Sequence, residues 1–211
     1  MTRLIVIRHG ETDWNRAGRV LGRAAGNHLN EKGRRDAALL ADALSTQGIV
    51  AVYTSPLERA METAQAICSA SGLDGPIPTE GLLEVDPGDW SGMMREDLYD
   101  DPIWIAAHEN PLGVRYPNGE ELSEVQARAL ATIEPLIERH QHQTFAVVTH
   151  GDVIRSIIAH YLGLSLEHIL RIIFDTASAS LVEFKAGEAR VIRTGWRVAD
   201  CKFPLDSAFG D

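Results

Sequence analysis

The chain has 211 residues, of which 45% are hydrophobic and 24% are charged, and its formal net charge is −10. This length allows one domain with a sizeable core and is short for two, so we expect a single domain over residues 1–211. The negative charge argues against nucleic-acid binding, which needs a basic surface, although a few arginines in a cleft can still bind a small anion.

No apolar segment has the length needed for export or for crossing a membrane. Only Leu4 to Ile7 precede Arg8 as a continuous apolar run, and no later run approaches about 18 residues. The two cysteines, Cys68 and Cys201, lack the spacing of a disulfide framework or of a zinc site. We therefore expect a cytoplasmic protein with reduced thiols and no membrane partner.

The first predicted strand covers residues 4–7 and stops at charged residues and a glycine. Residues 8–15 should then form a functional loop at its carboxyl end. Residues 18–30 are rich in glycine and aperiodic, which predicts a further loop. Asn30 can cap a helix that begins at Glu31, because apolar residues recur from there at helical spacing.

The second predicted strand, residues 49–54, leads into the helix with the clearest signal. Ser55 is a capping residue, Pro56 suits the first helical position, and Glu58 stands three residues after the cap. An apolar face follows at helical spacing. The pattern predicts a helix that begins at Pro56 and holds Arg59 in its first turn.

Residues 72–118 contain six of the nine prolines. We expect an irregular excursion from the fold there, with a short helix around residues 95–107 and a lid-like part at about 85–118. Apolar spacing predicts another helix over residues 120–140, which Pro135 should kink or break.

A third buried strand, residues 145–149, should end at His150, and Asp152 can cap the helix that follows it. Residues 180–185 and 189–194 are then expected to form a hairpin.

Residues 196–211 have no clear pattern, and we expect them to form a tail. The alternation of strands and helices before them predicts a three-layer α/β/α fold around a mostly parallel central sheet. Such sheets bind ligands beyond the carboxyl ends of their strands, so Arg8, His9 and His150 should share one edge.

The segment Arg8-His9-Gly10-Glu11-Thr12 resembles the signature of the histidine phosphatase superfamily, also called phosphoglycerate mutase-like. The resemblance covers roughly residues 3–165, and it implies the fold of that family. Further markers follow in order: Trp14-Asn15, Ser55-Pro56-Leu57-x-Arg59, Glu84 before Gly88-x-Trp90-x-Gly92, Pro117-x-Gly119-Glu120 and Thr149-His150-Gly151.

The resemblance implies a phosphomonoester hydrolase that needs no cofactor or metal. A phosphate monoester dianion repels nucleophiles, so such a site must supply positive charge and hold the reacting atoms in line. By the resemblance, His9 is the nucleophile that forms a phosphohistidine, and Glu84 is the general acid and then the general base. Arg8, Arg59 and a His150 protonated beside the dianion would bind the phosphoryl oxygens.

Four further residues are assigned to substrate binding by the resemblance: Asn15, Leu21, Gly22 and Gly151. Many relatives carry glutamine or threonine where this chain has Leu21, so its pocket should be less polar there. The alcohol part of a small phosphate-ester substrate would meet a group of aromatic side chains that could equally well form the core of the lid: Trp14, Trp104, His108 and Tyr116.

Two other functions compete with hydrolysis. A cofactor-dependent phosphoglycerate mutase must retain a bisphosphate, but residues 93–117 offer only Arg95 and Arg115 against five acidic residues. Asp152 also stands where mutases resemble one another in having asparagine. A catalytically inactive phospholigand-binding module would be expected to have lost the nucleophile or the acid. The resemblance also suggests a homodimer.

Two local alternatives concern single residues. Glu80 is a second candidate for the acid, although the spacing to Trp90 favours Glu84. His140 and His142 could suggest a metal site, but no third ligand lies at zinc-site spacing, so we interpret them as histidines at a helix end, where positive charge is favourable.

Overall fold

The computed structural model describes residues 1–198, and most of the predicted tail, residues 199–211, lies outside the described residues. Its six strands form one sheet in the order β3-β2-β4-β1-β5-β6. The first four run parallel, and the last two form an antiparallel hairpin at one edge. The strands are β1 (Thr2–Arg8), β2 (Ile49–Thr54), β3 (Ile77–Pro78), β4 (Thr144–Thr149), β5 (Ala179–Lys185) and β6 (Glu188–Trp196).

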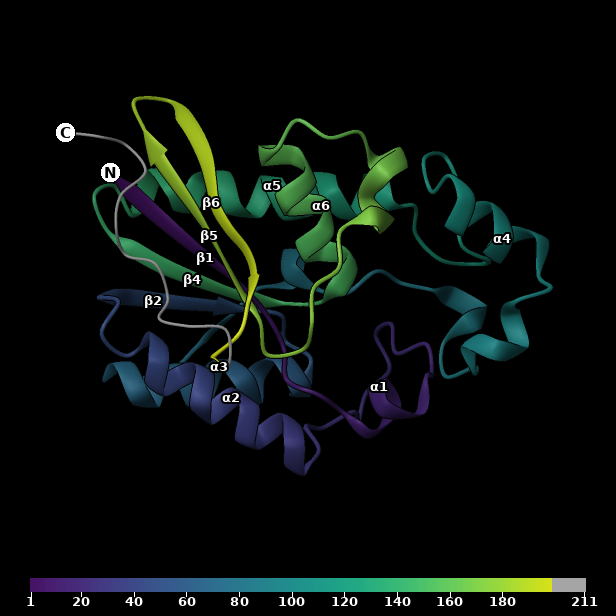
Figure 1. Cartoon of the computed structure of the whole chain (residues 1–211), viewed down its shortest axis with the longest axis horizontal. Coiled ribbons are helices and arrows are strands. Elements are labelled where there is room, and N and C mark those ends of the chain that lie inside the picture. The colour runs from purple at the N-terminus through teal and green to yellow at the C-terminus, as the bar shows by residue number, and fades with distance from the viewer. Residues whose placement is uncertain (199–211) are drawn as a thin grey trace.

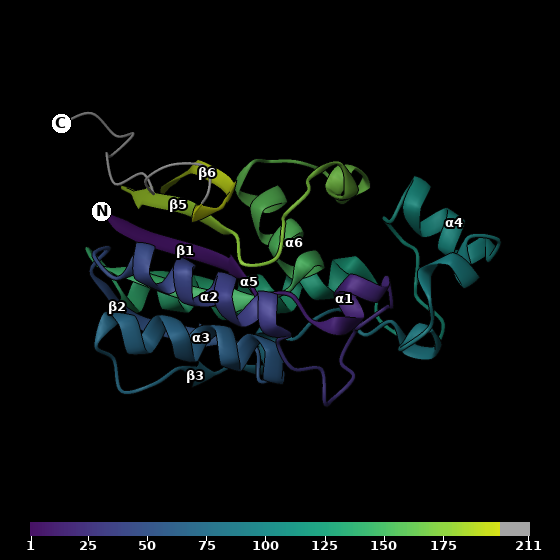
Figure 2. The ribbon, with the colours of Figure 1, turned by 60° about the horizontal axis from the view of Figure 1, so that its bottom comes forward.

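Helices cover both faces of the sheet (Figures 1 and 2). The α-helices are α1 (Asp13–Ala17), α2 (Glu31–Leu44), α3 (Glu58–Ser71), α4 (Pro102–Glu109), α5 (Leu122–Arg139) and α6 (Gly151–Tyr161). Successive side chains of a strand point to opposite faces, and β1 follows this rule. Leu4 and Val6 pack with α5 and α6, whereas Ile5 and Ile7 pack with α2 and α3. The predicted three-layer α/β/α fold is confirmed.

The excursion predicted for residues 72–118 consists of short elements. It holds β3, three turns of 3-10 helix at Glu80–Leu82, Gly88–Trp90 and Arg95–Leu98, and α4. The predicted short helix is thus divided into a 3-10 turn and α4. In both views α4 stands apart from the sheet, beyond the carboxyl end of β1 (Figures 1 and 2).

The two helix caps predicted at the ends of strands are wrong. α3 begins at Glu58 with Leu57 as its N-cap. The hydroxyl of Ser55 accepts a hydrogen bond from the Leu57 N–H at 3.3 Å and lies 2.7 Å from His150 Nε2, but it bonds to no N–H within α3. α6 begins directly after β4 with His150 as its N-cap, so Asp152 lies inside the helix. Arg59 does lie in the first turn of α3, as predicted.

Other local predictions have mixed outcomes. Asn30 caps α2 as predicted, by accepting a hydrogen bond from the Gly33 N–H at 2.8 Å. A break at Pro135 is wrong, because α5 continues through that residue. Cys68 is a buried free thiol, and Cys201 lies outside the described residues. Within residues 1–198, no helix combines the length and apolar character needed to cross a membrane.

Candidate active site

The predicted site residues meet at the carboxyl edge of the sheet. Arg8 ends β1, Arg59 lies at the start of α3 after β2, and His150 follows β4. A pocket of about 420 Å³ lies at this edge. Seven residues of the predicted set line it: Arg8, His9, Asn15, Leu21, Gly22, Arg59 and Glu84.

His9 is held in one orientation and one tautomer. Its side chain is buried, with 2% of its surface exposed. Nδ1 lies 2.7 Å from the Gly10 carbonyl oxygen, which can only accept, so Nδ1 carries the hydrogen. Nε2 is then unprotonated and accepts a hydrogen bond from Arg59 Nε at 3.3 Å. Burial and the charges of Arg59 and Arg8 hold the pKa of His9 well below its usual range. The lone pair of Nε2 is therefore unprotonated, and it can attack once its hydrogen bond from Arg59 is exchanged for the phosphorus.

Three buried nitrogens around His9 have no hydrogen-bond partner within residues 1–198: Arg8 Nε, Arg59 Nη1 and His150 Nδ1. Their side chains are fixed by other bonds, since Arg8 Nη1 donates to the Phe174 carbonyl at 2.6 Å and Arg59 Nη2 to the Gly22 carbonyl at 2.7 Å. A buried donor without a partner costs about 1–3 kcal/mol. An oxyanion bound beside His9 would supply the missing acceptors.

His150 is fully buried and is not among the residues that line the pocket. Its ring centroid is 5.1 Å from that of His9, and its Nε2 is 2.7 Å from Ser55 Oγ. Burial, together with Arg59, His9 and Arg8, lowers the pKa of His150 well below its usual range. The protonation expected from the sequence would therefore require the field of a bound dianion.

Glu84 supplies the acidic side of the pocket. Its Oε1 accepts a hydrogen bond from the Val85 N–H at 3.0 Å. Burial and the neighbouring charge of Asp152 raise the pKa of Glu84 to about 7. In a large fraction of the molecules Glu84 is therefore protonated at neutral pH, as a general acid must be. Glu80, the alternative candidate, does not line the pocket.

The substrate-binding residues occupy different positions. Asn15 lines the pocket, and its Oδ1 is bonded to Thr12 in the cap of α1. Gly22 has a φ of 47°, and an added Cβ would lie 2.2 Å from Pro87, so glycine is required there. Gly151 is not in the lining; it lies against Arg8, whose guanidinium a Cβ would meet at 3.7 Å.

This geometry agrees with the comparison with protein families. The model of the histidine phosphatase superfamily (branch 1) matches residues 4–197. The chain belongs to this superfamily.

Two phosphoserine phosphatases and the protein YhfR are similar to this chain. Phosphoserine phosphatase 1 from Hydrogenobacter thermophilus is 34% identical over 190 residues, which cover 88% of each chain. YhfR from Bacillus stearothermophilus has a TM-score of 0.85 and 33% identity, over 92% of this chain and 97% of its own. A phosphoserine phosphatase mutant from Entamoeba histolytica, in complex with phosphoserine, has a TM-score of 0.84 and 25% identity, over 92% and 97%.

A network that the sequence did not predict holds the Glu84 loop of this histidine phosphatase. Arg128 of α5 donates to the carbonyl groups of Gly81 at 2.9 Å, Leu83 at 2.6 Å and Glu84 at 3.1 Å. It also pairs with Glu120 at 3.1 Å. Glu120 is among the family markers, but no local pattern distinguishes Arg128 from a solvated helix arginine.

Replacing Arg128 with methionine should lower kcat/KM for alkyl phosphates by about 10²-fold, because the loop would no longer hold the Glu84 carboxyl in line. The loss should be smaller for p-nitrophenyl phosphate, whose leaving group needs no proton. Arg139→Met, at the exposed end of the same helix, is the matched control. Equal losses for both substrates would indicate a general structural effect instead.

Other lining residues were also missed or placed differently. Trp90, Asp152, Arg155 and Ile173 line the pocket. So do three of the four aromatic residues predicted to meet the alcohol part of the substrate: Trp104, His108 and Tyr116. The fourth, Trp14, is not in the lining and lies under the guanidinium of Arg19, 5.9 Å away.

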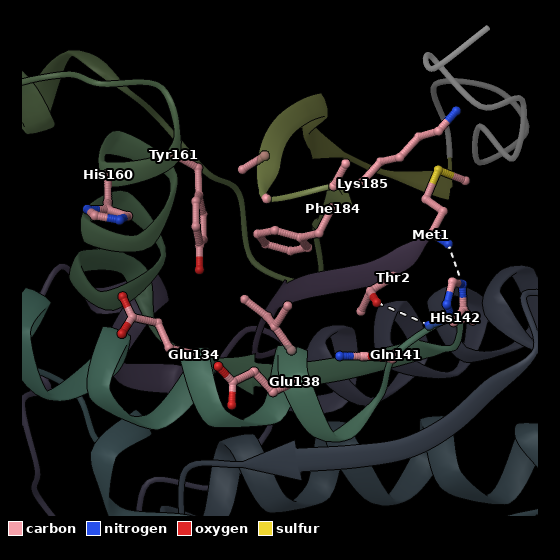
Figure 3. A pocket seen from close by; sticks show the side chains of 14 residues that line it. Met1, Thr2, Glu134, Glu138, Gln141, His142, His160, Tyr161, Phe184 and Lys185 are labelled. Atoms are coloured by element: carbon pink, nitrogen blue, oxygen red, sulfur yellow. Dashed lines mark hydrogen bonds between the residues drawn. The ribbon is translucent and has the colours of Figure 1, made fainter. Parts of the chain in front are cut away.

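A second hollow, of about 770 Å³, lies at the other end of the sheet, beside Met1 and Thr2 (Figure 3). It contains none of the predicted site residues, and the carboxylates of Glu134 and Glu138 line it. Lys185 and the amino group of Met1 also line it, so its charges nearly cancel, and it has no counterpart of the His9 and Glu84 pair. We therefore assign the active site to the smaller pocket.

The histidine pair at the end of α5 has ordinary partners. His140 Nε2 is 2.9 Å from the Tyr53 hydroxyl, and His142 Nδ1 is 2.9 Å from the amino group of Met1. Among residues 1–198, no group of three or more His, Cys, Asp and Glu side chains is placed to hold a metal ion.

Proposed function

We propose that this histidine phosphatase hydrolyses a small phosphorylated metabolite through a phosphohistidine on His9, without a metal cofactor. One observation carries the proposal: the unprotonated Nε2 of His9 shares a pocket with Glu84 and lies next to the unpaired donors of Arg8 and Arg59. The phosphatases among the similar proteins support it.

In the first step, His9 Nε2 attacks the phosphorus, and the bond from phosphorus to the ester oxygen breaks. Glu84 gives its proton to the leaving oxygen, so the alcohol departs neutral. Arg8, Arg59 and His150 donate to the phosphoryl oxygens, where negative charge must be stabilised in the transition state.

In the second step, the ionised Glu84 takes a proton from a water molecule, which attacks the phosphohistidine. The bond between phosphorus and His9 Nε2 breaks, and its electron pair returns to the imidazole. Inorganic phosphate leaves, His9 is again neutral, and Glu84 is again protonated. His9 and Glu84 thus return to the neutral forms that their shifted pKa values favour.

The pocket favours hydrolysis over phosphoglycerate mutase activity. Of the two arginines in the excursion, only Arg95 lines the pocket. Arg115 forms ion pairs with Glu121 at 3.2 Å and Glu124 at 2.8 Å. Arg155 also lines the pocket, but it is paired with Asp152 at 2.6 Å, so the pair adds no net positive charge for a second phosphate group.

The direct test is the release of inorganic phosphate in EDTA from p-nitrophenyl phosphate and from a panel of metabolite phosphates. We expect turnover without added metal and without added bisphosphate. An enzyme that releases no phosphate but interconverts phosphoglycerates, and only after priming with a bisphosphate, would contradict the proposal in favour of a mutase.

The rate should have a bell-shaped dependence on pH. Glu84 must be protonated, and its pKa is about 7, so activity should fall as the pH rises through neutrality. His9 must be neutral to attack phosphorus. Because its pKa is lowered, the activity lost through protonation of His9 should appear only at acidic pH.

Asp152→Asn tests the origin of the alkaline limb of that profile. The negative charge of Asp152 raises the pKa of Glu84, so its removal should move the alkaline limb to lower pH. The wild type and the variant act on the same substrate, so the effect of the substrate's second ionisation cancels when their profiles are compared. Asp42→Asn, on the exposed face of α2, is the control. An unchanged alkaline limb in Asp152→Asn would show that another group sets it.

A further inference from the structure

The active-site pocket is much larger than a phosphoryl group requires. Its volume of about 420 Å³ lies within the range of about 300–1,000 Å³ that is typical of small-molecule sites. A water molecule takes about 30 Å³, and a phosphoryl group has only four heavy atoms. If the pocket hydrolyses a phosphate ester, as proposed above, most of its volume is available to the alcohol part of the substrate.

One wall of that remaining volume is aromatic. Trp90 lies 5.3 Å from Trp104 and 5.1 Å from Tyr116, measured between ring centroids. Trp104 in turn lies 4.2 Å from His108. All four rings line the pocket, and Trp90 is only 4% exposed. Rings packed against one another in this way form a preformed apolar surface.

Apolar residues of a different segment line the same pocket. Leu170 lies in a 3-10 turn, Leu166–Arg171, and Ile173 follows it on the way to β5. Figures 1 and 2 show this turn on the side of α6 that faces α4. Ile173 is 77% exposed, the largest fraction among the exposed large apolar side chains of residues 1–198. An apolar group bound in the pocket would remove this side chain from water, which is favourable.

The charged groups in this part of the pocket are either paired within the protein or exposed to solvent. Arg155 Nη1 donates to Asp152 at 2.6 Å, and its Nε donates to the Ile172 carbonyl at 2.9 Å. Arg95 is exposed to solvent, where a charge contributes little. A small charged alcohol would therefore leave both apolar surfaces in contact with water.

We infer that the substrate's alcohol carries an apolar, ring-sized body that packs between the aromatic side chains of Trp90 and Trp104 and the side chain of Ile173. The inference rests on the proposed phosphatase activity and narrows its substrate class. It excludes the smallest phosphate esters, such as those of serine or glycerol, as the preferred substrates.

The experiment compares primary alkyl phosphates, whose alcohols differ little in acidity, so that differences in kcat/KM report binding of the alcohol part. We expect 2-phenylethyl phosphate to exceed ethyl phosphate by at least about tenfold, and O-phosphoserine to fall below 2-phenylethyl phosphate. Ile173→Ala should lower this ratio several-fold. Ile105→Ala should leave it unchanged, because Ile105 is 42% exposed on α4 and does not line the pocket.

Equal kcat/KM values across the alkyl series would overturn the inference and leave the phosphatase proposal standing. A preference for O-phosphoserine that is lost in Arg95→Met would also overturn the inference, because it would show that a charged side chain recognises the alcohol part of the substrate. If no ester is hydrolysed, the phosphatase proposal fails, and calorimetry with phosphonates tests the pocket alone. 2-Phenylethylphosphonate should then bind at least about tenfold more tightly than ethylphosphonate, and equal affinities would contradict the inference.

Discussion

His9→Ala is expected to lower phosphatase activity by at least about 10⁴-fold and to leave the fold intact. The variant lacks the Nε2 lone pair that attacks phosphorus, and no neighbouring group within the pocket replaces it. Arg8, Arg59 and His150 keep their own bonds to Phe174, Gly22 and Ser55, so the phosphate site should persist. Steady-state hydrolysis of p-nitrophenyl phosphate measures the loss, and thermal melting checks the fold.

Two comparisons make this result specific. His160→Ala removes an exposed histidine that lies in the second hollow, and it should retain full activity. Titration with inorganic phosphate should show that His9→Ala still binds the anion. A variant that keeps more than a few per cent of the wild-type rate would exclude His9 as the nucleophile. A protein that binds phosphate with or without His9 and hydrolyses nothing would instead be the inactive binding module.

The fold could be predicted where local pattern and tertiary structure agree. Residues 49–53 are a continuous apolar run in the sequence, and with Thr54 they form β2 with the predicted bounds. Asn30 caps α2 with its Oδ1 as predicted, while its Nδ2 donates to Glu11, so the tertiary bond does not compete with the cap. The expected single domain, homodimer and cytoplasmic location stay predictions, because no contact within residues 1–198 tests them.

The two failed cap predictions lie at the catalytic edge. Ser55 and Asp152 have strong capping propensities, but each follows a strand that ends at the site. There the side chains have other partners: Ser55 bonds to the distant His150, and Asp152 pairs with Arg155 one turn along the same helix. Local rules are expected to fail where side chains are recruited for function.

The candidate site was only partly predictable for the same reason. His9 and Glu84 stand in motifs that the family resemblance identifies, and the structure brings both into one pocket. Arg128 acts on carbonyl groups more than 40 positions earlier in the chain, and Ile173 lies in a segment without periodicity. Their contribution depends on long-range contacts, which no spacing rule reports.

Glu84→Gln should slow the hydrolysis of alkyl phosphates by about 10²–10⁴-fold and should slow p-nitrophenyl phosphate much less in its first step. An alkoxide leaves only when a proton reaches it, whereas nitrophenolate is stable without one. The glutamine amide oxygen can still accept the hydrogen bond from the Val85 N–H, so the loop should keep its position. Pre-steady-state release of nitrophenol separates this step from the next.

The same variant should accumulate the phosphohistidine, because it also lacks the base that activates water in the second step. With p-nitrophenyl phosphate we expect a burst of nitrophenol and, after alkaline quenching, one added phosphoryl group in intact-mass spectra. The double variant His9→Ala, Glu84→Gln should show neither, and Glu80→Gln should behave as the wild type. Equal slowing of both substrates, or no adduct, would assign the acid and base to another group. A burst with the adduct on His9 would show that Glu84 acts in both steps. The raised pKa of Glu84, caused by burial and by the charge of Asp152, suits a group that must both donate and accept a proton.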